Sequence, residues 1–165
     1  QGDWSSDVCS SDLSVTTESA SMAIRCDADT AWAAVSDITR TGEWSPECTG
    51  GRWVAPADGP AVGARFEGDN AMVVAGITLK RWTATSEVTA CEPGRVFEFG
   101  AEGYTTWRYE ITPTPEGCTV TESYAHRPHV GWQKFLYDTV ARRNRSMHSG
   151  TVRTLTRLRD ALEAR

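Results

Sequence analysis

The feature that most constrains the fold of this chain is a run of short strand-like segments between residues 51 and 126. Six segments combine β-branched and aromatic residues with alternating apolar positions: 51–55, 64–69, 77–89, 96–99, 105–112 and 118–126. The tetrapeptides CEPG (91–94) and TPEG (114–117) supply the Pro and Gly of tight turns. Because strands joined by tight turns pair antiparallel, the region predicts an antiparallel meander.

Helical patterns flank this run. Residues 15–25 alternate as a further strand, after which Asp27 or Asp29 can cap a short helix that extends to Val35. The stretch DITRTGEW (37–44) predicts a second short helix or turn, ended by Pro46. Near the C-terminus, apolar residues recur every three or four positions and predict a long amphipathic helix. They are Trp132, Phe135, Leu136, Val140, Met147, Val152, Leu155, Leu158 and Leu162.

Together these elements predict an α+β fold. Its parts are a bent antiparallel sheet of about seven strands around the long C-terminal helix, and two short helices after the first strand. A strongly bent sheet presents more inward-facing side chains than one helix can fill, so we expect a concave apolar pocket between them. The stretch GDNAMVVAG (68–76) lacks the strand–helix context of a nucleotide loop, and we interpret it as a mobile loop over that pocket.

Residues 3–13 (DWSSDVCSSDL) show none of these patterns. All eleven match the in-frame translation of a common short-read sequencing adapter. We therefore interpret residues 1–13 as foreign to the protein, and expect them to be disordered with Trp4 exposed. The domain is predicted to span residues 14–165. Without Asp3, Asp7 and Asp12 the formal net charge changes from −5 to −2.

Charge and cysteine content restrict the partners and the compartment. The mild acidity gives no overall attraction to nucleic acid or to an anionic membrane, and no apolar run approaches the ~20 residues of a membrane span. Cys26, Cys48, Cys91 and Cys118 are scattered without metal-ligand spacing, which favours free thiols in a reducing cytoplasm. No metal and no other cofactor is predicted. The richness in Arg and Ala favours a bacterial source.

Several stretches carry a family resemblance. They are DADTAWAAVSDITRTGEWSPE, GPAVGARFEGDN, RWTATSEVTACEPGRVFEFG, TTWRYEITP and CTVTESY, which cover most of residues 22–125. In combination they resemble the SRPBCC superfamily, and within it the polyketide cyclase/dehydrase-like branch. The resemblance implies a START-like helix-grip fold, in which a seven-stranded antiparallel sheet grips the last helix around a hydrophobic cavity. The branch has no universal catalytic motif to transfer, so "cyclase/dehydrase" names a family here and not a reaction.

Strand alternation sorts the side chains into two faces. In 105–112, for example, Arg108 and Glu110 share the solvated face and Trp107 and Tyr109 the other. The residues predicted to line a ligand cavity are Phe66, Asn70, Trp82, Ser86, Phe97, Phe99, Trp107, Tyr109, Glu122 and Tyr124, with Trp132 and Met147 from the C-terminal part. A filled core with its polar groups satisfied locally is the alternative.

Glu122 is the most informative of these residues, because a carboxylate on an inward face must be paired, hydrogen-bonded or neutral. We favour a structural hydrogen bond from an indole N–H or an Arg. The alternative is general acid/base catalysis, with Glu122 and Tyr124 as the candidate catalytic residues. His126 and His129 are interpreted as loop residues and not as metal ligands.

Three functions stay open. The first is binding of a small hydrophobic molecule, such as a lipid, a polyketide or an aromatic metabolite. The second is a polyketide aromatase/cyclase or dehydrase whose inward polar residues act as acid and base. The third is a protein-interaction module with a vestigial pocket. The expected partner is a small hydrophobic ligand of a monomer or homodimer, without nucleic acid and without stable membrane insertion.

Overall fold

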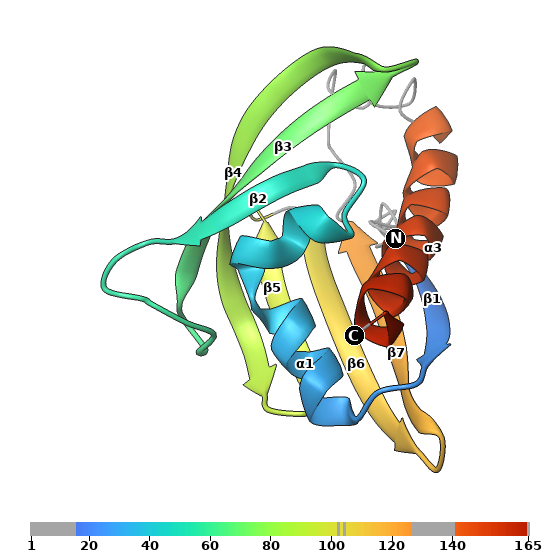
Figure 1. Ribbon diagram of the computed structural model, residues 1–165. Coiled ribbons are helices and arrows are strands. Elements are labelled where there is room, and N and C mark those ends of the chain that lie inside the picture. Colours follow the sequence, from blue (N-terminus) through green and yellow to red (C-terminus); the bar gives the residue numbers. More distant parts are fainter. Residues whose placement is uncertain (1–15, 102, 104, 127–140, 165) are drawn as a thin grey trace, which may run out of the picture.

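The computed structural model describes residues 16–101, 103, 105–126 and 141–164, with the backbone alone at residues 16, 74 and 141–149 (Figure 1). Seven strands form one antiparallel sheet in the order β1-β7-β6-β5-β4-β3-β2. Their bounds are β1 Thr16–Ile24, β2 Cys48–Trp53, β3 Arg65–Val74, β4 Ile77–Glu92, β5 Val96–Ala101, β6 Thr105–Thr114 and β7 Gly117–His126. The predicted α+β class and the antiparallel meander are confirmed.

Two short helices carry the chain from one edge of the sheet to the other. α1 (Ala28–Ser36) begins at the predicted cap, where the Asp27 carboxylate accepts hydrogen bonds from the Thr30 backbone N–H at 2.8 Å and its hydroxyl at 2.7 Å. The 3-10 helix η1 (Ile38–Glu43) follows at once and ends at Trp44, which is 1 % exposed. Because both helices lie across the sheet, β1 and β2 come to opposite edges (Figure 1).

The long helix α3 (Ala141–Glu163) packs against β1, β7 and η1, on the same side of the sheet as α1 (Figure 1). Leu155, Leu158 and Leu162 face the core as predicted, whereas Val152 is 40 % exposed. Thr151 and Thr154 are buried in its place, and the Thr154 hydroxyl donates to the carbonyl of Gly150 at 3.1 Å. Such a bond to the preceding turn lets a threonine occupy a buried helix position.

The interpretation of residues 68–76 as a loop is wrong. β3 continues through Val74, and a two-residue turn at Ala75 and Gly76 leads directly into β4. Both turn residues have positive φ, 50° and 80°, which is the backbone of a tight hairpin turn. The stretch is therefore an extended arm of the sheet. The predicted turn at 114–117 is confirmed, since β6 ends at Thr114 and β7 begins at Gly117.

None of the helices in the described part of the chain is long and apolar enough to cross a membrane. Trp4, Trp132 and the whole of residues 1–13 lie outside the described residues, as does the side chain of Met147.

Candidate ligand-binding site

The half of the concave sheet face beneath α1 is a packed core. Val88 of β4, Phe97 of β5 and Val120 of β7 are 1 %, 0 % and 0 % exposed. α1 covers β5, β6 and β7, and Leu155 and Leu158 of α3 join the same apolar cluster. Hydrophobic burial in this half holds the sheet to the helices.

A row of aromatic rings, which we call the aromatic band, borders this core on the concave face. It consists of Trp53, Phe66, Phe99, Trp107 and Tyr124, from five different strands. Ring centroids lie 5.6 Å apart for Trp53 and Phe66, 5.1 Å for Phe66 and Phe99, and 5.3 Å for Trp107 and Tyr124. Phe99 and Trp107 are register partners on β5 and β6. Because Trp53, Phe99 and Trp107 are only half-buried, the band offers apolar surface to a further molecule.

Small residues lie beside the band on β3 and β4. Gly68 faces Ala84 in the register, and Phe66 faces Ser86. A Cβ added at Gly68 would stay 3.6 Å from the sulfur of Cys48, an ordinary van der Waals separation. Wide aromatic rings next to residues with almost no side chain make an uneven surface with raised and hollow parts. Such a surface can fit the shape of an apolar ligand.

A buried carboxyl–phenol pair lies on the same concave face. Tyr109 Oη donates a hydrogen bond to Glu122 Oε1 at 2.8 Å, and the two residues are register partners on β6 and β7. Glu122 is 3 % exposed, and its Oε2 has no hydrogen-bond partner among the described residues. The predicted indole or Arg partner is therefore wrong, and the partner is the phenol of Tyr109.

Burial controls the protonation of this pair. It raises the pKa of Glu122 to about 8, although the hydrogen bond from Tyr109 acts in the opposite direction. Burial, and then the negative charge of Glu122, raise the pKa of Tyr109 well above its ordinary value. A carboxyl group with a pKa close to 8 is largely protonated at neutral pH, so it can donate as well as accept a hydrogen bond.

Tyr124 lies one inward position beyond Glu122 on β7 and pairs in register with Glu18 of β1. Burial first and Glu18 second raise the pKa of Tyr124 to about 12, which keeps the phenol neutral. Further along β7, His126 Nδ1 lies 3.0 Å from the hydroxyl of Thr105. His126 ends β7, as in the predicted strand 118–126, so its assignment to the following loop is wrong, and His129 lies outside the described residues.

The structure brings ten of the predicted lining residues to the concave face. Phe66, Ser86, Phe97, Tyr109, Glu122 and Tyr124 are buried there, and Asn70, Trp82, Phe99 and Trp107 are half-buried. The sequence reasoning missed Trp53, because segment 51–55 was not sorted into faces. Its alternation of Gly51 with Trp53 was the signal that could have placed this tryptophan on the inner side.

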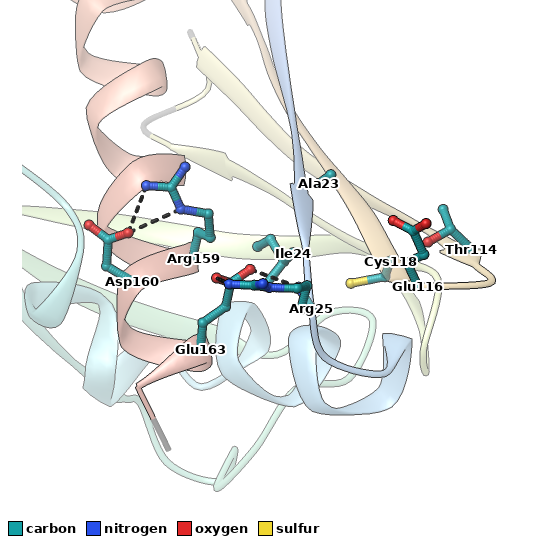
Figure 2. A pocket seen from close by; sticks show the side chains of 9 residues that line it. All are labelled: Ala23, Ile24, Arg25, Thr114, Glu116, Cys118, Arg159, Asp160 and Glu163. Atoms are coloured by element: carbon teal, nitrogen blue, oxygen red, sulfur yellow. Dashed lines mark hydrogen bonds and ion pairs between the residues drawn. The ribbon is translucent and has the colours of Figure 1, made fainter.

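A separate pocket of about 500 Å³ lies where the C-terminal end of α3 meets β1 and the β6–β7 turn (Figure 2). Its wall is mainly polar, and none of the predicted lining residues belongs to it. Arg25 donates to Glu163 through its backbone N–H at 2.9 Å and its guanidinium at 3.1 Å, and Arg159 donates to Asp160 at 2.8 Å. These charges satisfy one another, so the aromatic band and not this pocket is the candidate site.

No group of three His, Cys, Asp or Glu side chains that could hold a metal ion occurs within residues 16–101, 103, 105–126 and 141–164.

Comparison with known proteins identifies the family. Residues 15–163 match the family described as polyketide cyclase/dehydrase and lipid transport. The chain belongs to this family. The match begins at Val15, two positions after the end of the adapter-like stretch at residues 3–13. No curated protein matches the chain.

Solved structures agree with this family membership. The Polyketide_cyc-like protein Cgl2372 from Corynebacterium glutamicum is 34 % identical, with a TM-score of 0.63 over 91 % of this chain and 93 % of that one. The AHSA1-like protein from Aeromonas hydrophila is 19 % identical, with a TM-score of 0.60 over 88 % and 94 %. The di-domain ARO/CYC StfQ of the steffimycin pathway is 15 % identical, with a TM-score of 0.68 over 91 % of this chain and 51 % of StfQ. The last two share the helix-grip fold.

Proposed function

We propose that the protein binds a small hydrophobic molecule, such as a lipid, a polyketide or an aromatic metabolite, against the aromatic band on the α3 side of the sheet. The observation that supports it most is the exposure of Trp53, Phe99 and Trp107, three large aromatic side chains that stay half-buried beside a fully packed core. Burying such rings against an apolar ligand releases hydration water and is favourable. The lipid transport in the family description agrees with this function.

The carboxyl–phenol pair gives the proposed site its polar end. Ligand pockets commonly combine apolar walls with a few placed polar groups that orient the bound molecule. A protonated Glu122 with an unpartnered Oε2 can donate to a carbonyl or accept from a hydroxyl of the ligand. We therefore infer a ligand that is largely apolar and carries at least one oxygen.

One observation favours a second function, acid–base catalysis of the cyclase or dehydrase kind. A carboxyl group with a pKa of about 8 can both give and take a proton near neutral pH, which is what a general acid/base requires. Glu122 would be the proton-transferring residue, with the phenol of Tyr109 positioning its carboxyl group at 2.8 Å. The substitution Glu122→Gln distinguishes this function from simple binding, as set out in the Discussion.

Filling the space beside the aromatic band tests the binding function. Ala84 faces the band, whereas Thr85 is the next residue on β4 and lies exposed on the outer face. We expect Ala84→Trp to weaken binding of an anilinonaphthalene sulfonate probe about tenfold or more, a loss of about 1.4 kcal/mol, because the new indole occupies the ligand's place. Fluorescence titration measures the affinity.

The matched control is Thr85→Trp, which adds the same indole to the opposite face and should leave probe affinity unchanged. Equal affinities for both variants and the wild type would contradict a ligand site at the aromatic band. Mass spectrometry of small molecules that copurify with the wild type, and are missing from Ala84→Trp, would identify the ligand.

We infer a reducing, cytoplasmic location and a bacterial source. Cys26, Cys48, Cys91 and Cys118 are all free, in agreement with a compartment that keeps thiols reduced. Burial raises the pKa of Cys118 to about 12, so this thiol is protonated and unreactive. We infer no nucleic-acid partner, because the formal charge of −5 does not attract a polyanion.

We also propose that residues 1–13 are foreign to the domain, which agrees with the family match that begins at residue 15. Deleting them should leave the melting temperature unchanged within about one degree, since a terminal segment without packing partners contributes little stability. Differential scanning calorimetry of the full and shortened chains makes the comparison. A clear fall in melting temperature would show that this segment packs on the domain.

A further inference from the structure

The tip of the β3–β4 hairpin exposes more large apolar surface than any other part of the described chain. Met72, Val73, Ile77 and Leu79 are 43 %, 53 %, 65 % and 62 % exposed, and they surround the tight turn at Ala75 and Gly76. Two further large apolar side chains are comparably exposed among the described residues, Val62 and Val152, and they lie on other elements. Apolar side chains gathered at one spot on a protein surface mark a place of contact.

The outer part of this hairpin, residues 70–86, carries a charge opposite to that of the whole chain. The net formal charge is −5, yet residues 70–86 contain no Asp or Glu and carry two cations, Lys80 and Arg81. Both are exposed, and neither forms an ion pair within the described residues. Lys80 Nζ lies 5.4 Å from the ring centroid of Trp82. The cations are therefore available to an anionic partner beside the apolar tip.

A stretch of the chain rich in arginine begins α3 at the same end of the molecule. The sequence places Arg142, Arg143 and Arg145 in the first turns of α3, which contain no acidic residue. Figure 1 shows that the beginning of α3 and the tip of the β3–β4 hairpin lie at the same end of the molecule. This end combines apolar side chains with basic residues, although the protein as a whole is acidic.

We propose that the β3–β4 hairpin tip docks reversibly on the surface of an anionic lipid bilayer. A strand advances about 3.3 Å per residue, so Lys80 lies about 10 Å behind Ile77 along β4. Interfacial segments bury their apolar side chains about 5–10 Å into the headgroup region, with Lys and Arg facing the lipid phosphates. The spacing of tip and cations fits that depth, and the docking is peripheral, without a membrane span.

Charge favours a bilayer over a second copy of the chain as the occupant. A copy brought tip to tip would place like charges, Lys80 and Arg81 of each chain, close together around the apolar contact, and like charges repel. An anionic lipid surface attracts the same cations and also receives the apolar tip. The proposal goes beyond ligand binding at the aromatic band and does not depend on it.

Co-sedimentation of the full chain with vesicles tests the proposal. We expect binding to vesicles of equal parts phosphatidylcholine and phosphatidylglycerol, much weaker binding to phosphatidylcholine alone, and loss of binding as salt increases. Lys80→Gln together with Arg81→Gln should weaken binding about 25-fold, since each cation near an anionic surface contributes about fivefold. Ile77→Thr together with Leu79→Thr should weaken it about tenfold or more on both vesicle types, because less apolar area is buried.

Val62→Thr is the matched control. Val62 is 67 % exposed in the connection between β2 and β3, so the change removes an equally exposed apolar side chain away from the tip, and binding should be unaffected. Two results would overturn the proposal. One is a wild-type chain that binds neither vesicle. The other is a wild-type dimer, seen by light scattering, that Ile77→Thr with Leu79→Thr converts to a monomer. Probe affinity at the aromatic band, measured on the same variants, reports separately on the ligand site.

Discussion

Raising the pH from about 5 to about 9 is expected to lower the free energy of unfolding of the wild-type protein by about 4 kcal/mol more than that of the Glu122→Gln variant. The reason is that only the wild type must ionise a buried carboxyl group. The pKa of Glu122 is about 8 in the folded protein against an ordinary 4.5. Between these values the folded state holds a proton that the unfolded state has released, so stability falls as pH rises. Below pH 4.5 the protonated Glu122 makes its full contribution to the stability of the folded protein, and above about pH 8 no further stability is lost.

Urea unfolding of both proteins across this pH range measures the difference, since all other titrating groups contribute equally to each. At about pH 5 the two should be similar, because the amide oxygen that Glu122→Gln introduces can still accept from the Tyr109 hydroxyl. Tyr109→Phe is the complementary variant. It removes the bond that lowers the pKa of Glu122, so the fall in stability should extend to a higher pH and become larger, while it still begins near pH 4.5.

The same Glu122→Gln variant separates the two proposed functions. A variant that is less stable than the wild type by ~1–3 kcal/mol at every pH would mean that Glu122 is an ionised structural acceptor, and the raised pKa would be wrong. If the protein is a cyclase or dehydrase, Glu122→Gln should lower turnover about 10²-fold or more while the fold stays stable. If it only binds, ligand affinity should change little.

Gly117→Ala should destabilise the protein by about 3 kcal/mol or more. A methyl group at this position would overlap backbone atoms, which cannot move aside as a flexible side chain can. An added Cβ would overlap the carbonyl oxygen of Ile24 and lie 3.0 Å from both the Cα of Arg25 and the N of Cys26. The φ of Gly117 is +146°, a conformation that side chains rarely adopt. The chain between β1 and α1 crosses here, so relief of the overlap would shift the start of α1.

Gly59→Ala is the matched control for this glycine. No atom lies within 4 Å of its added Cβ, and its φ is not positive, so the stability change should stay within about 0.5 kcal/mol. Chemical unfolding at one pH compares the three proteins. An equal, small effect at both positions would mean that the β1–α1 connection does not pack on Gly117.

The sequence predicted the elements whose signals are local. A cap at Asp27 or Asp29, the turn at 114–117 and the two faces of β6 all followed from neighbouring residues. In the structure the cap is Asp27, and the turn and the two faces are in place. On the outer face of β6, Arg108 pairs with Glu98 at 2.9 Å and with Glu110 at 2.9 Å, in agreement with its predicted solvated side. Family membership, which covers residues 15–163, could also be recognised from short stretches of sequence.

Residues 68–76 show where local signals end. The run Ala71, Met72, Val73 and Val74 has no alternation in its sequence. Ala71 is still buried, whereas Met72 and Val73 are 43 % and 53 % exposed, so both faces of the arm leave the core beyond Ala71. Periodicity reports burial on one side of a strand and gives no signal where neither side is buried. The burial of Thr151 and Thr154 was not predicted for a different reason, because packing of the helix against the sheet buries these residues although they are polar.

The sequence by itself determined that Glu122 faces inward, because side chains alternate along a strand whatever lies beside it. Only the tertiary structure decided its partner. Tyr109 is thirteen residues away along the chain, and the register of β6 against β7 places the two opposite each other. Register depends on the turn that joins two strands and on the packing of the whole sheet, and a slip by one residue would turn every side chain to the other face. The raised pKa of Glu122 and its buried oxygen without a hydrogen-bond partner among the described residues follow from that packing, which no local pattern contains.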